Sequence, residues 1–217
     1  SITINSLDGL TGNGTWTAES GGSNLAVNEL YFIDGSNSLQ FDVGATGGSI
    51  VNSTMSQVDL SDHDESSTLF LWVYLPTITG VTDVRLRWGN DASNYWSRTS
   101  TTPHFGTAFV TGWNLVSFAW NGATETGTVA PVTIDYLRPT VTTTAAITAI
   151  RIDKVFSALP MIHEVVYYSK FLFRTSSGTF QETITSTDDT ELLNLDTDSY
   201  PLYFNKLGML VAQQTQG

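Results

Sequence analysis

A cluster of arginine and aromatic residues lies in the stretch RLRWGNDASNYWSR, residues 85–98. Half of the six arginines of the chain fall within this stretch, although the chain as a whole has a net charge of −12. A flat aromatic ring can stack on the C–H face of a pyranose, while a guanidinium group donates in-plane hydrogen bonds to hydroxyl groups or to a carboxylate. These residue types are therefore the ones that a sugar platform would use.

The same stretch predicts a β-hairpin, because two apolar-rich runs flank a turn of glycine, asparagine, aspartate and serine. A turn centred on the Asp91–Ala92 bond directs one set of side chains to the core: Val84, Leu86, Trp88 and Tyr95. The opposite face then holds four candidate glycan-binding residues: Arg85, Arg87, Trp96 and Arg98. The alternative is that these arginines pair with carboxylates such as Asp83 and Asp91, with Trp96 packed on the arginine stems.

Catalytic motifs are missing from the sequence, which contains no H-E-x-x-H, G-x-S-x-G, P-loop or G-x-G-x-x-G pattern. Glycoside hydrolysis needs two carboxylates about 5 to 10 Å apart, and the glutamates considered for such a pair are isolated from one another along the chain. These are Glu19, Glu29, Glu65, Glu125 and Glu164. We therefore predict that the protein is not an enzyme, and we rank a glycan-cleaving activity behind other functions.

Composition excludes further classes. The nine basic and twenty-one acidic side chains argue against a nucleic-acid partner, because phosphate binding needs clustered positive charge. No apolar run of about 18 residues is present, so we expect no membrane insertion by a helix. The chain has no cysteine, and with 41% hydrophobic residues we expect packing rather than disulfides to stabilise the fold. The tryptophans Trp72 and Trp120 are predicted in this core, with Trp16 and Trp113 at its ends.

Short alternating runs of threonine, valine and aromatic residues recur about every ten to fifteen positions, separated by Gly, Asn, Asp and Pro. This pattern predicts an all-β fold, an antiparallel β-sandwich of jelly-roll type, over residues 1–172. Residues 173–217 are more acidic, and we predict a linker followed by a short α-helix over 199–214 that continues the chain or docks on a partner. Pro201 suits the first turn of such a helix, and Leu202, Leu207 and Leu210 give it a loose apolar stripe.

Several stretches in order resemble carbohydrate-binding jelly-roll modules of the galactose-binding-like or concanavalin A-like kind. They are LDGLTGNGTW (7–16), DGSNSLQFDV (34–43), VDLSDHDESSTLFLWVYLP (58–76), GWNLVSFAW (112–120) and ITAIRIDKV (147–155). Together with the extension LNLD…SYPLYFN…AQQ, the whole also resembles jelly-roll regions in structural proteins of tailed-phage virions. That second resemblance would fit a fragment of a longer virion protein, located on a virion or an extracellular surface.

The resemblance also implies a structural calcium ion, because many such modules carry one near their first and last strands. Asp8, Asp34 and Asp153 stand at the matching positions, and calcium prefers six to eight oxygen ligands. The alternative is that these are turn-forming and strand-end aspartates.

Two functional hypotheses of different classes follow. The first is a non-catalytic module that binds a glycan on a concave sheet or at the loop ends. The second is a purely structural assembly protein without a glycan ligand, such as a head-decoration, collar or tail component that packs against symmetry mates. Under either hypothesis we expect a homo-oligomer or part of a larger assembly.

Overall fold

Several strands of this protein alternate regularly between buried and more exposed side chains. In β6 (Thr68–Leu75) every second residue is buried and the residues between are half-buried, which is the period of a strand with one face on a core. The computed structural model describes residues 1–63, 66–159, 171–172, 181–182, 202–204 and 210–212. The chain divides into two compact units, Ser1–Met161 and Ile162–Gly217.

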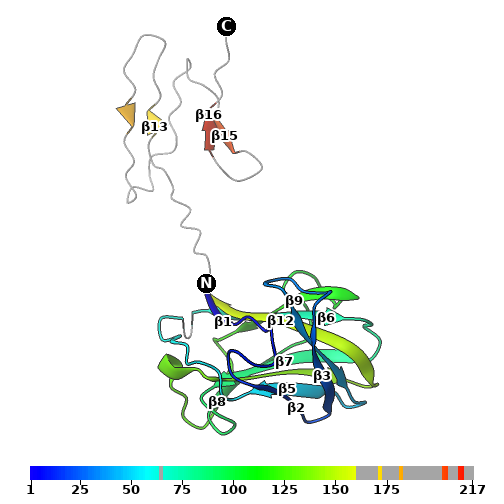
Figure 1. Ribbon diagram of the computed structural model, residues 1–217. Helices are drawn as coiled ribbons and strands as arrows, with labels where there is room; N and C mark the ends of the chain where they lie inside the picture. The colour runs from blue at the N-terminus through cyan, green and yellow to red at the C-terminus, as the bar shows by residue number, and fades with distance from the viewer. Residues whose placement is uncertain (64–65, 160–170, 173–180, 183–201, 205–209, 213–217) are drawn as a thin grey trace. The chain divides into compact units, whose positions relative to one another are not determined.

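The first unit is an antiparallel β-sandwich of two sheets, which confirms the predicted fold class (Figure 1). One sheet has the order β3-β4-β12-β6-β9, and β1 pairs with β12 beside this path. We call it sheet A. It comprises β1 (Ile2–Asn5), β3 (Gly22–Asn28), β4 (Ser38–Val43), β6, β9 (Gly112–Ala119) and β12 (Ile147–Ala158).

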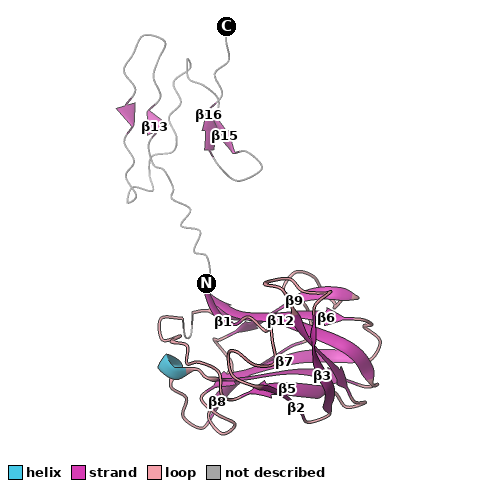
Figure 2. Ribbon diagram, viewed as in Figure 1, coloured by secondary structure: helices cyan, strands magenta, loops and turns pink. Residues whose placement is uncertain are grey.

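The other sheet, sheet B, has the order β10-β8-β7-β11-β5-β2. It comprises β2 (Trp16–Glu19), β5 (Gly48–Asn52), β7 (Val81–Gly89), β8 (Tyr95–Ser100), β10 (Thr124–Thr126) and β11 (Tyr136–Thr143). A 3₁₀ turn, η1 (Pro131–Thr133), precedes β11 and is the helical segment drawn in Figure 2. Among the described residues no helix is long and apolar enough to cross a membrane.

The core lies between the two sheets. Sheet A contributes side chains such as Phe41, Leu71, Val73, Phe118 and Ile152, and sheet B contributes Ile50, Val84, Leu86, Trp88 and Leu137. Trp16 and Trp120 are buried in this core as predicted. Trp72 and Trp113 are not: both are half-buried, and Trp72 lies among the half-buried positions of β6.

The domain boundary falls earlier than the predicted residue 172, because β12 is the last strand of the sandwich and the first unit ends at Met161. After Leu159, the next described residues are Phe171–Leu172. Those two residues form β13, which pairs with β14 (Gln181–Glu182).

The predicted C-terminal helix is wrong for the described part of residues 199–214. Leu202–Phe204 (β15) and Leu210–Ala212 (β16) are antiparallel strands paired with each other. Tyr203, Phe204 and Val211 belong to the β-branched and aromatic types that favour strands, and Gly208 lowers helix propensity between them. The apolar stripe that suggested a helix was too loose to outweigh these preferences.

Candidate functional site

The hairpin of β7 and β8 forms with a register one residue away from the predicted one. Gly89 pairs with Tyr95, and Trp88 pairs with Trp96. Residues 90–94 therefore make a five-residue loop rather than an even-numbered turn, and a shift of one residue moves every side chain of a strand to the other face.

Side chains at the loop fix this register. The Asp91 carboxylate accepts hydrogen bonds from the main-chain N–H groups of Ser93 (2.6 Å) and Asn94 (2.9 Å), an arrangement that stabilises turns. The Asn94 side chain also donates to this carboxylate, and it lowers the pKa of Asp91 more than either main-chain hydrogen bond does. The Asn90 amide donates to the Thr133 carbonyl oxygen at 2.7 Å, so a segment 43 residues away also holds the loop.

The corrected register moves Trp96 from the predicted ligand face to the core side. Its ring lies 4.8 Å from the ring of Trp120, which in turn lies 5.4 Å from Trp88. Trp96 is half-buried and packs against the hydrophobic core. It is therefore not available as the flat platform that the sequence suggested.

Tyr95 takes that place on the outer face of sheet B. The guanidinium carbon of Arg87 lies 4.4 Å from the centre of the Tyr95 ring, and Arg138 of β11 stands directly opposite Arg87 in the sheet. Arg85 lies two residues before Arg87 and therefore on the same face. We call Arg85, Arg87, Tyr95 and Arg138 the arginine–tyrosine face.

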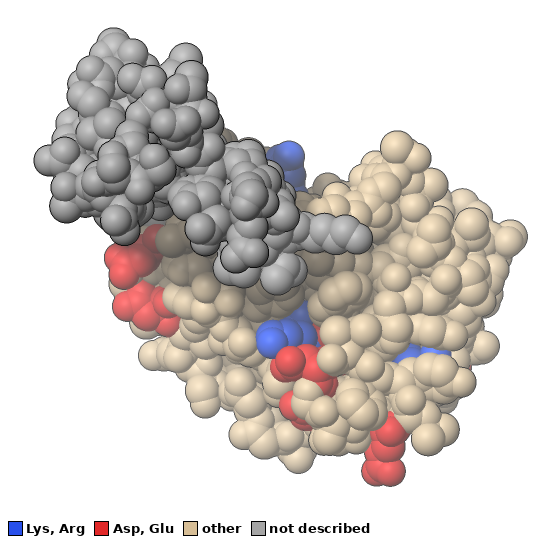
Figure 3. All heavy atoms as spheres, turned by 90° about the horizontal axis from the view of Figure 1, so that it is seen from above, with Lys and Arg blue, Asp and Glu red and all other residues tan. Residues whose placement is uncertain are grey.

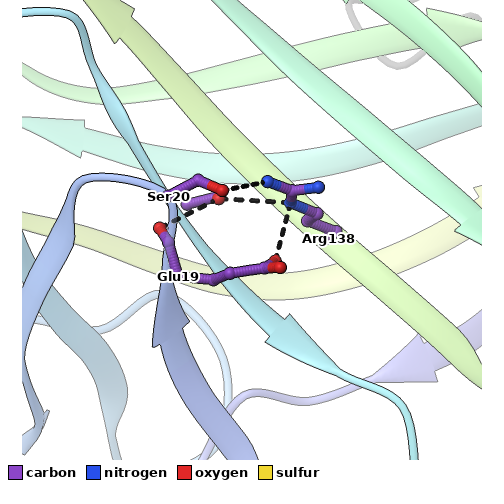
Figure 4. A network of polar contacts seen from close by, with 4 residues as sticks. Glu19, Ser20 and Arg138 are labelled. Atoms are coloured by element: carbon purple, nitrogen blue, oxygen red, sulfur yellow. Dashed lines mark hydrogen bonds and ion pairs between the residues drawn. The ribbon is translucent and has the colours of Figure 1, made fainter. Parts of the chain in front are cut away.

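Arg138 is the most firmly held residue of this face (Figure 4). Its Nε lies 3.0 Å from the Glu19 carboxylate and donates to the Ser49 hydroxyl at 3.2 Å. A second nitrogen donates to the Ser20 hydroxyl at 2.7 Å. Glu19 ends β2, Ser20 directly follows it, and Ser49 lies in β5, so two strands other than β11 fix the orientation of one guanidinium group.

Arg85 has far fewer side-chain contacts than Arg138. Among residues 1–63 and 66–159 its guanidinium group has no ion-pair, hydrogen-bond or ring partner, and its Nε is buried without an acceptor. It lines a pocket of about 460 Å³ between β7, β8 and β10, together with Tyr95, Arg98 and Thr124. This volume lies within the range of small-ligand sites.

Arg98 reaches this pocket from the other side of β8. It stands opposite Leu86 in the register, on the core side, and not beside Arg85 as predicted. Its guanidinium group donates to the Gly122 carbonyl oxygen in the loop before β10. The structure thus places two of the three predicted arginines, Arg85 and Arg98, at one pocket, and Tyr95 lines it in place of the predicted Trp96.

Tyr136 is two residues before Arg138 and therefore on the same face of sheet B, where it is buried with its ring centre 6.3 Å from that of Tyr95. Burial raises the pKa of Tyr136, and the charges of Arg138 and Arg87 act in the opposite direction. Its hydroxyl group therefore stays protonated at neutral pH.

Aromatic side chains also gather on the outer face of sheet A, and the sequence did not predict this. Tyr74 packs against Tyr31 and Trp113, with ring centres 5.7 and 5.5 Å away. Arg151 is enclosed between two of these rings, 4.5 Å from Tyr31 and 4.6 Å from Tyr74. Unlike Arg85, this cation already has partners.

Figure 3, seen from above the view of Figure 1, shows charged side chains only in small separate groups.

The three predicted calcium ligands come together around the loop between β3 and β4. Asp153 Oδ2 accepts the N–H groups of Ile33 (2.5 Å) and Asp34 (3.0 Å). Asp8 Oδ1 accepts those of Ser36 (3.0 Å) and Asn37 (3.2 Å). The three carboxylates thus lie at one loop, and two of them accept its main-chain hydrogen bonds.

The charges at this loop are only partly compensated. Asp34 forms an ion pair with Lys154 at 3.0 Å, whereas Asp153 Oδ1 is buried without a hydrogen-bond partner. Burial raises the pKa of Asp153; the N–H groups of Ile33 and Asp34 oppose this, and the charges of Asp8 and Asp34 add to it. In the described part of the chain no group of three acidic or histidine side chains is arranged to hold a metal ion.

Comparisons with known proteins agree with the fold. No family model matches the sequence, and no curated protein matches it. An exo-β-agarase structure is similar with a TM-score of 0.52 and 9% identity, over 85% of this chain and 29% of that one. This likeness supports the β-sandwich architecture alone.

Two carbohydrate-binding modules from Clostridium thermocellum are similar at lower TM-scores. A family 11 module in complex with a β-1,3-1,4-mixed-linked tetrasaccharide has a TM-score of 0.48 and 10% identity, over 73% of this chain and 94% of that one. A family 30 module of a cellulosomal cellulase has a TM-score of 0.47 and 16% identity, over 74% and 98%. At these scores they support no conclusion about the ligand of this chain, which has to come from the geometry of the site.

Proposed function

We propose that the protein is a non-catalytic carbohydrate-binding module whose ligand lies on the arginine–tyrosine face of sheet B. One observation carries the proposal: the guanidinium group of Arg85 has no partner in the described part of the chain, and it lines a pocket with Tyr95. An aromatic ring beside unpaired planar donors suits a pyranose, which offers C–H groups to the ring and hydroxyl groups to the donors.

The carboxylates near this face are engaged in structural contacts. Glu19 pairs with Arg138 at 3.0 Å, and the Asp83 carboxylate accepts the hydroxyl groups of Thr142 (2.8 Å) and Thr82 (3.1 Å). A hydrolase would need one carboxyl group free to protonate the leaving oxygen and a second free to act as base or nucleophile. These contacts favour binding without cleavage.

Isothermal titration calorimetry with a panel of soluble polysaccharides tests this proposal. Binding should be lost in Tyr95→Ala and weakened in Arg85→Ala. Tyr31→Ala is the matched control, because Tyr31 lies in the β3–β4 loop beside Tyr74 of sheet A and does not line the pocket. No binding to any polysaccharide by the wild-type chain would contradict the proposal, as would equal binding by Tyr95→Ala.

A place in a tailed-phage particle is a separate proposal, supported by the sequence resemblance described above. Under it the chain is located on the virion, with neighbouring virion proteins or further copies of itself as partners. Mass spectrometry of purified particles should then find the chain at a copy number related to particle symmetry. A trace amount would count against this role and against a purely structural function without a glycan ligand.

A structural calcium ion at Asp8, Asp34 and Asp153 is likewise a proposal. The buried, unpartnered Oδ1 of Asp153 supports it, whereas four main-chain N–H groups and Lys154 already engage the three carboxylates. If calcium binds, a chelator lowers the melting temperature of the protein. An unchanged melting temperature would contradict the proposal of a structural calcium ion.

A further inference from the structure

The arginine–tyrosine face concentrates positive charge without enough internal counter-charge. Arg87 and Arg138 stand directly opposite each other on neighbouring strands, a placement in which like charges are destabilising. Arg85 adds a third guanidinium group two residues away. The chain has a net charge of −12, yet in its described part only Arg138 of these three has a carboxylate partner.

Arg85 and Arg87 leave donors unused. The Nε atoms of both residues are buried and have no hydrogen-bond acceptor, and a buried polar group without a partner is unfavourable. The ring of Tyr95 partly compensates Arg87, but in residues 1–63 and 66–159 Arg85 has no ion pair, hydrogen bond or ring contact. A ligand that brings an anionic acceptor would relieve both the repulsion and the unsatisfied donors.

We propose that the arginine–tyrosine face selects polysaccharides that carry anionic groups, either carboxylate or sulfate, over neutral ones. This inference rests on the proposed function and names its ligand class. The pyranose ring stacks on Tyr95, and the anionic group of the same or the next sugar receives two parallel N–H donors from Arg85. Arg87, two residues further along β7, and Arg138, opposite Arg87 on β11, add positive potential beside Arg85.

Two carboxylates set the limits of the anionic subsite. Asp83 lies two residues before Arg85 on the same face of β7, and Glu19 lies beyond Arg138. Both would repel an anion placed next to them. The favourable position therefore lies away from both carboxylates, on the β8 side of Arg85, at the pocket that Arg85 lines with Tyr95 and Arg98.

The overall negative charge of the protein opposes the binding of anionic polymers. A net charge of −12 repels a polyanion at long range. Binding of an anionic polymer would thus require local, oriented contacts and not general charge attraction. A measured preference for anionic glycans would therefore have to come from contacts at the arginine–tyrosine face.

Matched polymer pairs test the inference. Carboxymethylcellulose is compared with hydroxyethylcellulose, and dextran sulfate with dextran, by affinity electrophoresis and calorimetry. We expect an affinity higher by about tenfold for the anionic member of at least one pair, since one charge-assisted bidentate contact is worth about that much. The two pairs distinguish a carboxylate from a sulfate ligand.

Variants assign the preference to the face. Arg85→Gln should abolish the preference for the anionic polymer and keep the melting temperature, while Arg151→Gln on sheet A should leave the preference unchanged. Equal binding to both members of each pair would overturn the inference and leave the proposed function standing. If the wild-type chain bound none of these polysaccharides, both the inference and the proposed function would be overturned. Polyglutamate is a control without sugars, and equal binding to it would also overturn the inference.

Discussion

Neighbouring residues Tyr95 and Trp96 should have opposite effects when each is replaced by alanine. The register of the hairpin places Tyr95 on the outer face of sheet B and Trp96 on the core side. Trp96→Ala should therefore lower the stability of the fold and spare ligand binding. Tyr95→Ala should abolish binding and spare most of the stability.

The size of the stability effect follows from the contacts of each ring. Trp96 packs 4.8 Å from Trp120, which packs 5.4 Å from Trp88. Truncation of a buried tryptophan costs about 3–5 kcal/mol, and because Trp96 is only half-buried we expect about 2–3 kcal/mol. Tyr95 loses mainly its contact with Arg87, and an exposed cation–π contact contributes about 0.5–1 kcal/mol.

Urea unfolding and calorimetric binding on the same samples measure both quantities. For a domain of this size, about 2–3 kcal/mol corresponds to a melting temperature lower by about 4–12 °C. A larger stability loss for Tyr95→Ala than for Trp96→Ala would contradict this register. So would a Trp96→Ala variant that unfolds like the wild type and has lost the ligand, because Trp96 would then lie on the outer face.

Three further changes probe the loops and the buried charge. Asn114→Ala should cost about 2 kcal/mol in urea unfolding, since this buried amide makes three hydrogen bonds to the main chain at Val110 and Gly112; a loss near zero would contradict those contacts. Gly14→Ala should destabilise more than Gly12→Ala by thermal unfolding, because both glycines have positive φ but only at Gly14 would a Cβ meet other atoms, the nearest at 2.3 Å. Burial raises the folded-state pKa of Asp153 above its ordinary 3.8, so the stability that this carboxyl contributes is full below pH 3.8 and is lost as the pH rises through the folded-state pKa. Asp153→Asn should remove that part of the decline in urea unfolding measured from pH 4 to 7, and an unchanged slope would show that another group causes it.

The fold was readable from the sequence because sheet strands leave a local signal. In β6 aliphatic residues alternate with Thr68 and aromatic residues, and this alternation matches the alternation of burial in the structure. The two faces of such a strand are harder to tell apart when both are apolar. For this reason the sequence predicts Trp72 in the core. In the structure it lies with Phe70 and Tyr74 among the half-buried positions of the strand.

The site was readable only in part. The concentration of arginines in residues 85–98 is a property of composition and needed no structure. Which of Tyr95 and Trp96 accompanies them depends on whether the loop has an even or an odd number of residues. That number is fixed by Asp91 and by the contact of Asn90 with Thr133, and a contact over 43 positions leaves no trace in the local pattern.

The convergence of Asp8, Asp34 and Asp153 could be anticipated from the order of motifs, but their contacts could not. Lys154 has a φ of 44° and interrupts the register of β12 directly after Asp153. Such an interruption redirects neighbouring side chains. Two of the three carboxylates became acceptors for the main chain of the β3–β4 loop, a role that depends on backbone geometry.

The position of β12 in sheet A has a consequence for how the protein folds during synthesis. This strand is the last of the sandwich to leave the ribosome, yet it lies between β4 and β6 and also pairs with β1. Until residues 147–158 emerge, β4 and β6 have no strand between them, and β1 has no partner. A topology that depends on such distant pairing folds slowly. Sheet A can therefore close only after translation has passed the end of the domain, and a nascent chain stopped before Ile147 would expose strand edges that favour aggregation.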